Sequence, residues 1–266
     1  MRTLSHIAIA LSLVGCADPD EGVESAKRLA ATAHAADRVD GLFMRLQPAP
    51  LVELVADPPG VLGLSIDCQI PPPPGALAAW AGPCIQGDGS QIIGELVVGT
   101  ASDGDWLSAS AFELIDVDGL AARVDGAIST VEQGEYLILD LSGSWCGLGG
   151  VACTDEDPRS TVSWTVFPAA ALELPVATYD ATVSGAIDLG DEVLAVEAAW
   201  SVDEAVCPDE PASGTFALAG AHRQSLSLDG ATACDGCGAW RIGGRTLRWC
   251  SSESGAEQSF FEISNP

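Results

Sequence analysis

From Ser90 onward, the chain is a succession of short runs in which apolar and polar residues alternate. The run at 91–99 reads QIIGELVVG and the run at 135–145 reads EYLILDLSGSW. Six further runs share the pattern: 121–129, 160–167, 192–202, 213–220, 224–230 and 239–244. Alternation with a period of two predicts β-strands with one buried face, and no long amphipathic helix intervenes to form a parallel sheet. We therefore expect a mainly β fold, an antiparallel β-sandwich or a barrel-like sheet.

The last two strands are predicted to form a hairpin around Gly243-Gly244. A two-residue turn there places Cys237 opposite Cys250, at a non-hydrogen-bonded pair where side chains approach most closely. The same register separates the two faces: Trp240, Ile242, Leu247 and Trp249 on one, and Arg241, Thr246 and Arg248 on the other. The hairpin argues against a redox site at Cys234-Asp-Gly-Cys237, because such sites need a helix to lower a thiol pKa.

The chain has nine cysteines, and setting aside Cys16 leaves an even number. An even number in an exported chain predicts disulfides. The expected pairs are Cys68–Cys84 across a proline-rich turn, Cys146–Cys153 around Gly149-Gly150, Cys237–Cys250 from the hairpin register, and Cys207–Cys234 from the two that remain.

The N-terminus has the order of an export signal. Arg2 precedes an apolar run from Ile7 to Val14, which is too short to span a bilayer. The following residues, Leu13-Val14-Gly15-Cys16, resemble the lipobox of bacterial lipoproteins. The resemblance implies cleavage before Cys16, lipidation of that cysteine, and a Gram-negative cell-envelope location. Ala17 follows where an aspartate would favour inner-membrane retention, so the resemblance points to the outer membrane.

Three segments follow from these features. Residues 1–15 are expected to be a lipoprotein signal peptide, 16–60 an anchor-proximal linker and helix, and 61–266 a disulfide-stapled β domain. Within the linker, apolar residues from Val23 to Leu46 approximate one helical face, and Pro48, Pro50, Pro58 and Pro59 are expected to break the helix.

Two stretches of the β domain echo each other. ARVDGAIS at 122–129 resembles ATVSGAID at 181–188, and FELI at 112–115 resembles LELP at 172–175. Each echo is followed by an acidic turn, an alternating strand, a tryptophan and a cysteine. The pattern predicts an internal duplication, with repeat units at about 84–146 and 153–207 and a terminal hairpin region at 207–266.

The net charge of −27 repels nucleic acid, so no nucleic-acid partner is expected. One basic cluster stands out: Arg241, Arg245 and Arg248. It is a possible anion-binding site, although compensation of the protein's own negative field is the alternative that we favour from sequence.

No catalytic constellation emerges from the sequence. The G-x-S-x-G pattern is missing, and the acidic residues are too abundant for any pair to indicate glycoside hydrolysis. Asp103/Asp105 and Asp116/Asp118 have spacings that suit calcium but complete no EF-hand, and acidic turn residues commonly only form turns. We expect no catalytic residue, no metal site and no cofactor, with calcium as a weak alternative.

The sequence therefore favours a lipid-anchored, exported cell-envelope protein with a non-catalytic structural or binding role. The membrane is its expected partner through the anchor, and its protein or glycan partner and specific ligand are open. Two alternatives remain: an exported hydrolase acting on carbohydrate, which a pocket joining Trp106, Trp164 or Trp240 to two carboxylates would favour, and an acidic calcium-binding envelope module.

Overall fold

The computed structural model describes residues 42, 45–149, 151–154, 157–170, 178–203, 205–207, 211–220, 223–228, 237–242 and 245–250, all within one compact unit. Its helical elements are α2 (Ala49–Ala56), α3 (Pro58–Leu62) and the 3-10 helix η1 (Ile66–Cys68). Its strands are β1 (Gln69–Ile70), β2 (Ala78–Ala81), β3 (Cys84–Ile85), β4 (Gln91–Thr100), β5 (Asp105–Asp116), β6 (Gly119–Gln133), β7 (Tyr136–Cys146), β8 (Arg159–Phe167), β9 (Thr178–Asp188), β10 (Val193–Asp203), β11 (Pro211–Ala219), β12 (Arg223–Leu228), β13 (Cys237–Ile242) and β14 (Arg245–Cys250).

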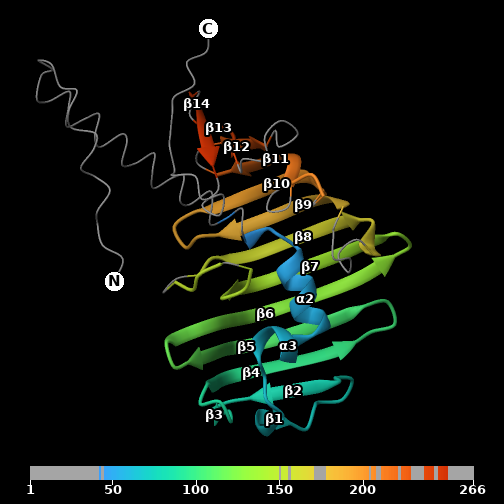
Figure 1. Cartoon of the computed structure of the whole chain (residues 1–266), viewed down its shortest axis with the longest axis vertical. Helices are drawn as coiled ribbons and strands as arrows, with labels where there is room; N and C mark the ends of the chain where they lie inside the picture. Colours follow the sequence, from blue (N-terminus) through green and yellow to red (C-terminus); the bar gives the residue numbers. More distant parts are fainter. Residues whose placement is uncertain are drawn as a thin grey trace, which may run out of the picture. The chain divides into compact units, whose positions relative to one another are not determined.

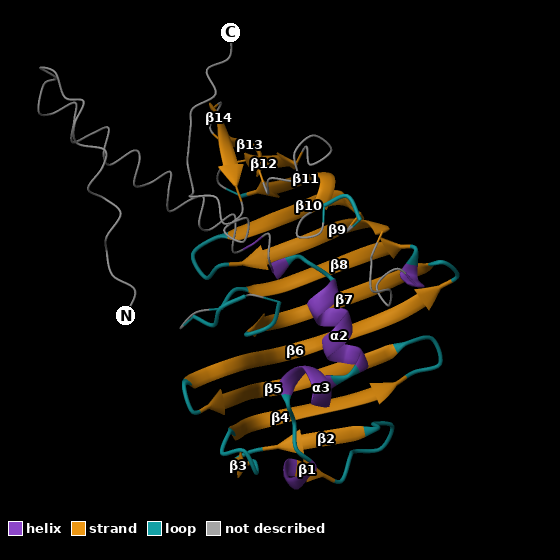
Figure 2. Cartoon of the chain, viewed as in Figure 1, coloured by secondary structure: helices purple, strands orange, loops and turns teal. Residues whose placement is uncertain are grey.

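All described strands belong to one antiparallel sheet in which chain neighbours are also sheet neighbours (Figures 1 and 2). The order runs from β1 through β2 and β4 to β14, and the short β3 pairs with β4 beside this path. The expectation of a mainly β, antiparallel fold preceded by a short helix is confirmed. The meander follows from short turns between alternating runs, since only antiparallel strands are joined by tight connections.

The terminal hairpin has the predicted backbone register. Cys237 lies opposite Cys250, Trp240 opposite Leu247, and Ile242 opposite Arg245. Gly243-Gly244 and the side chains of both cysteines lie outside the described part, so the Cys237–Cys250 disulfide stays a prediction.

One face of the sheet is apolar and buried. Trp145, Trp164 and Trp240 are at most 2% exposed, as alternation along their strands predicts. Helix α2 lies across this sheet in Figure 1 and contacts β5 and β6. The indole Nε1 of Trp164 donates a hydrogen bond of 2.7 Å to the carbonyl oxygen of Leu46. The segment before the first strand therefore completes the core.

The prolines of this segment do more than break a helix, which corrects the expectation. Pro48 is the N-cap of α2, and α3 begins at Pro58. The fixed φ of proline suits the first helical turn, where its missing N–H has no partner to lose. The helix expected before Pro48 lies mostly outside the described residues. Among those that are described, no helix has the length and apolar character needed to cross a membrane.

Two of the predicted disulfides are confirmed: Cys68–Cys84 and Cys146–Cys153. Cys207 is fully buried and disulfide-bonded, while its predicted partner, Cys234, lies outside the described residues. The proline run at 71–74 is a connection rather than the whole turn, because β1 and β2 pair on either side of it. Sequence reading missed these two strands because they are short.

The echoing stretches form strands β6 and β9. Gly126 and Gly185, which occupy matching positions in the echo, both have positive φ, and a Cβ on either would collide with the backbone of a neighbouring strand. The tryptophans differ in register: Trp145 lies opposite Val124 and Trp200 opposite Ala181, two residues earlier in the echo. The second copy of the FELI-like stretch lies outside the described residues, so the duplication stays a prediction.

Candidate functional site

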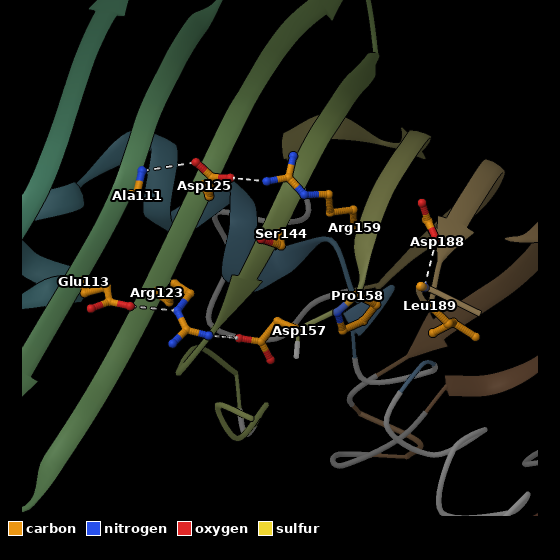
Figure 3. Close-up of a pocket in the computed structure, with 11 residues that line it drawn as sticks. Ala111, Glu113, Arg123, Asp125, Ser144, Asp157, Pro158, Arg159, Asp188 and Leu189 are labelled. Atoms are coloured by element: carbon orange, nitrogen blue, oxygen red, sulfur yellow. Dashed lines mark hydrogen bonds and ion pairs between the residues drawn. The ribbon is translucent and has the colours of Figure 1, made fainter. Parts of the chain in front are cut away.

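An open pocket of about 570 Å³ lies over strands β5 to β9 (Figure 3). Its charged lining residues are four carboxylates and two arginines, so their net charge is −2: Glu113, Asp125, Asp157, Asp188, Arg123 and Arg159. The strands position most of these side chains, while Asp157 comes from the loop between β7 and β8. The pocket is therefore an assembly of oppositely charged groups on a rigid sheet.

Asp157 is the centre of this assembly, although its side chain is only 2% exposed. Its Oδ1 accepts a 2.8 Å hydrogen bond from Arg45 Nη2 and a 3.0 Å bond from Thr154 Oγ1. Its Oδ2 accepts a 3.2 Å bond from Arg123 Nη1, and Arg123 Nε donates in turn to Glu113 Oε1 at 3.0 Å. The carboxylate thus joins the segment before α2 to the sheet and to its own loop.

Arg45 reaches Asp157 from the buried side. Its guanidinium also donates to the carbonyl oxygen of Trp145, and its Cζ lies 5.9 Å from the centroid of that indole ring. Burial lowers the pKa of Arg45, while the hydrogen bond and the negative charge of Asp157 oppose this shift. A desolvated cation of this kind depends on its counterion, since an unpaired buried charge is costly.

A second group, above Asp157 in Figure 3, surrounds Asp125. Ala111 has a left-handed φ of 46° at a bulge in the β5–β6 pairing, and its N–H donates to Asp125 Oδ1 at 3.0 Å. Asp125 Oδ2 accepts from Arg159 Nη2 at 2.6 Å. The carboxylate therefore satisfies the N–H that the bulge displaces from the ladder.

The arrangement of ion pairs holds neighbouring segments of the described chain together. Each of the described arginines in this region has a carboxylate partner, and Asp188 Oδ1 accepts from the N–H of Gly190 to form a turn. The buried part holds the β7–β8 loop and the segment before α2 on the sheet.

Trp106, Trp164 and Trp240 do not meet two carboxylates in either described pocket, which is the arrangement that would favour a carbohydrate hydrolase. Trp164 and Trp240 belong to the buried core, and Trp106 packs against Gly99 of β4. A second pocket, of about 330 Å³, lies over β6 to β9 and is lined mainly by serine and threonine with Asp140. None of the three tryptophans lines either of these pockets. The observation that would favour a hydrolase is therefore missing from both.

One group of described residues has the spacing of a metal site: Cys146, Cys153 and Asp157. The two sulfurs share a disulfide and Asp157 is paired with two arginines, so these residues do not fit an ion. The candidate calcium turns contain ordinary turn hydrogen bonds, such as the one of 2.8 Å from Asp118 N–H to Asp116 Oδ1.

The sequence-predicted basic cluster is divided by the backbone register. Arg241 lies opposite Thr246 and Arg248 lies opposite Ala239, so these two arginine positions belong to the same face of the hairpin. Arg245 lies opposite Ile242, at a position that belongs to the other face. Arg223, on the adjacent strand, was not included from sequence. Its rarity could have pointed to it, because the chain has only 11 basic residues against a net charge of −27.

Cys16 and the three histidines of the chain, His6, His34 and His222, lie outside the described residues. Sequence reasoning also missed Arg45, Arg123, Arg159 and Asp157, because their contacts join residues as much as 112 positions apart. Comparison with known proteins gave no matching family model, no matching curated protein and no matching solved structure.

Proposed function

We propose that the chain is a lipid-anchored, exported protein of the Gram-negative outer membrane with a non-catalytic structural or binding role. The observation that carries the proposal is the oxidised state of its cysteines: two closed disulfides and a third bonded cysteine, Cys207. Disulfides persist in oxidising compartments such as the periplasm and the cell surface. The lipobox-like Leu13-Val14-Gly15-Cys16 supplies the anchor in this proposal.

The non-catalytic role is supported by how the larger pocket is built. Its arginines and their carboxylate partners form ion pairs with one another. The side chain of Asp157 is only 2% exposed. General acid–base catalysis needs a titratable group within reach of substrate and a pKa matched to its task. The pocket is instead lined by ion pairs that join separate segments of the chain.

The test is Cys16→Ser in a Gram-negative host, with Ser12→Ala as a matched control within the signal peptide. We expect Cys16→Ser to abolish incorporation of labelled fatty acid and to release the chain from the membrane fraction, while Ser12→Ala stays labelled in the outer-membrane fraction. Unchanged labelling and membrane association of Cys16→Ser would exclude the lipid anchor.

A further inference from the structure

Three exposed arginines lie on neighbouring strands at the C-terminal end of the sheet: Arg223 on β12, Arg241 on β13 and Arg248 on β14. Arg241 lies opposite Ser225, two residues from Arg223, and Arg248 lies opposite Ala239, two residues from Arg241. Each arginine is thus one strand and two residues from the next. The three form a diagonal row, here called the arginine row, with steps of about 8 Å between neighbours.

The arginine row is on the face opposite to the core, because Trp240 next to Arg241 is fully buried. The same face of the sheet also carries Ser225, Ser227 and Thr246, which are half-buried. Guanidinium and hydroxyl groups together donate hydrogen bonds to oxyanions, and the planar guanidinium matches phosphate geometry.

Strands β11 to β14 contain no aspartate or glutamate, although the whole chain has 38. Within the described parts, no ion pair reaches Arg223 or Arg241. Arg248 takes part in a contact of its own. The charged side chains of these four strands are therefore all of one sign, in a chain whose net charge is −27.

This placement separates two explanations of the basic cluster. An arginine that compensates the protein's own field lies beside carboxylates, as Arg123 and Arg159 do at 3.0 Å and 2.6 Å. Arg223 and Arg241 instead point away from the core on acid-free strands. The arrangement therefore favours an external anion over the internal compensation that we favoured from sequence.

We propose that the arginine row binds the phosphate groups of anionic phospholipids at the surface of the membrane that carries the chain. The proposal rests on the lipid anchor proposed above, because the anchor brings a chain of net charge −27 to the membrane, whereas the arginine row acts only on phosphates within about 10 Å at 0.1 M salt. Each arginine near such a surface contributes roughly fivefold to partitioning, so three contribute on the order of 100-fold.

The experiment uses the full chain with Cys16→Ser, which cannot be acylated. Binding is measured by co-sedimentation with phosphatidylglycerol vesicles and with phosphatidylcholine vesicles at about 0.1 M salt, and the ratio of the two partition coefficients is the readout. We expect the ratio to exceed one clearly. Replacing Arg223, Arg241 and Arg248 together by Gln is expected to lower it on the order of 100-fold, whereas replacement of all three by Lys retains most of it.

The matched control adds three negative charges elsewhere on the outward face: Ser108→Glu, Ser142→Glu and Thr182→Glu, all at exposed positions. Both triple variants change the net charge from −27 to −30, three units in each case. The control is expected to change the ratio by less than about threefold, because charges beyond about 10 Å are screened at 0.1 M salt.

A ratio near one for the parent, or an equal ratio for the parent and the Gln variant, overturns the proposal. So does self-association of the parent that the Gln variant abolishes without any preference for anionic vesicles, because the row would then bind the acidic face of a second copy. Circular dichroism confirms that the variants are folded. The vesicle ratio is independent of acylation, so its failure is distinguishable from failure of the lipid anchor in cells.

Discussion

Two groups of arginines lie on the same sheet in opposite electrostatic settings. Arg45, Arg123 and Arg159 converge on carboxylates around the β7–β8 loop, and the Arg45–Asp157 pair is 9% and 2% exposed at its two side chains. Arg223 and Arg241 are exposed on strands that contain no acidic residue. Burial, and the carboxylates that the fold brings near, therefore set the physical role of each arginine.

The largest expected effect comes from breaking the buried pair. Asp157→Ala leaves Arg45 buried without its counterion, and we expect the free energy of unfolding to fall by about 3–5 kcal/mol. Denaturant titration followed by tryptophan fluorescence measures the change. Arg223→Gln is the matched control from the other group, with an expected effect within about 0.5 kcal/mol. Equal losses from the two variants would contradict the distinction between the groups.

The next largest effect is expected from removing the disulfide in the loop that carries Asp157. The disulfide Cys146–Cys153 closes a loop with a sequence separation of 7. Replacing both cysteines by Ser is expected to cost about 2.5 kcal/mol from chain entropy alone. A double-mutant cycle with Asp157→Ala tests coupling: if the loop positions Asp157, the two losses are less than additive. Strict additivity would show that Asp157 keeps its contacts without the disulfide.

A smaller effect is expected at the exposed member of the paired group. Arg159 bonds to Asp125 at 2.6 Å, but its side chain is 69% exposed, so water and salt screen the pair. Arg159→Gln should lower the free energy of unfolding by about 0–1 kcal/mol, and 0.5 M salt should remove the difference. A loss as large as that of Asp157→Ala would mean that exposure does not separate the two pairs.

The smallest effect concerns a carboxylate whose partner is neutral rather than cationic. Asp88 Oδ1 accepts from the hydroxyl of Ser90 at 2.6 Å and from its N–H at 2.9 Å, and these bonds lower the pKa of Asp88. A lowered pKa stabilises the fold above the ordinary aspartate pKa of about 3.9, and this contribution is lost as pH falls through the folded value.

We therefore expect Ser90→Ala to raise the pKa of Asp88 toward its ordinary value, because the hydroxyl donor is the largest cause of the shift. NMR titration of the Asp88 carboxyl carbon in the parent and in the variant measures it directly. No change in the Asp88 titration would show that the backbone N–H alone holds the carboxylate.

Periodicity and turns were sufficient to predict much of the sheet. Alternation placed most of the long strands, although β5 and β9 are in none of the predicted runs. Counting outward from Gly243-Gly244 placed Cys237 opposite Cys250 as observed. Spacing alone identified Cys68–Cys84 and Cys146–Cys153, because short loops bring their ends together whatever surrounds them. These are local properties, in which the residues that interact are close in sequence.

The candidate site could not be predicted in this way. Arg45 and Asp157 meet only because the segment before α2 packs on the sheet, and the bulge at Ala111 that recruits Asp125 leaves no mark in the alternation pattern. The row formed by Arg223, Arg241 and Arg248 likewise requires the register of three strands.

The antiparallel β class, the hairpin register and the short-range disulfides follow from the order of residues, because side-chain alternation and loop closure act over a few residues. The hairpin register also separated Arg241 and Arg248 from the apolar face, but only the tertiary structure shows which arginines are paired with carboxylates. Charge pairing depends on distance in space, and within a meander that distance is set by strand order, register and burial together.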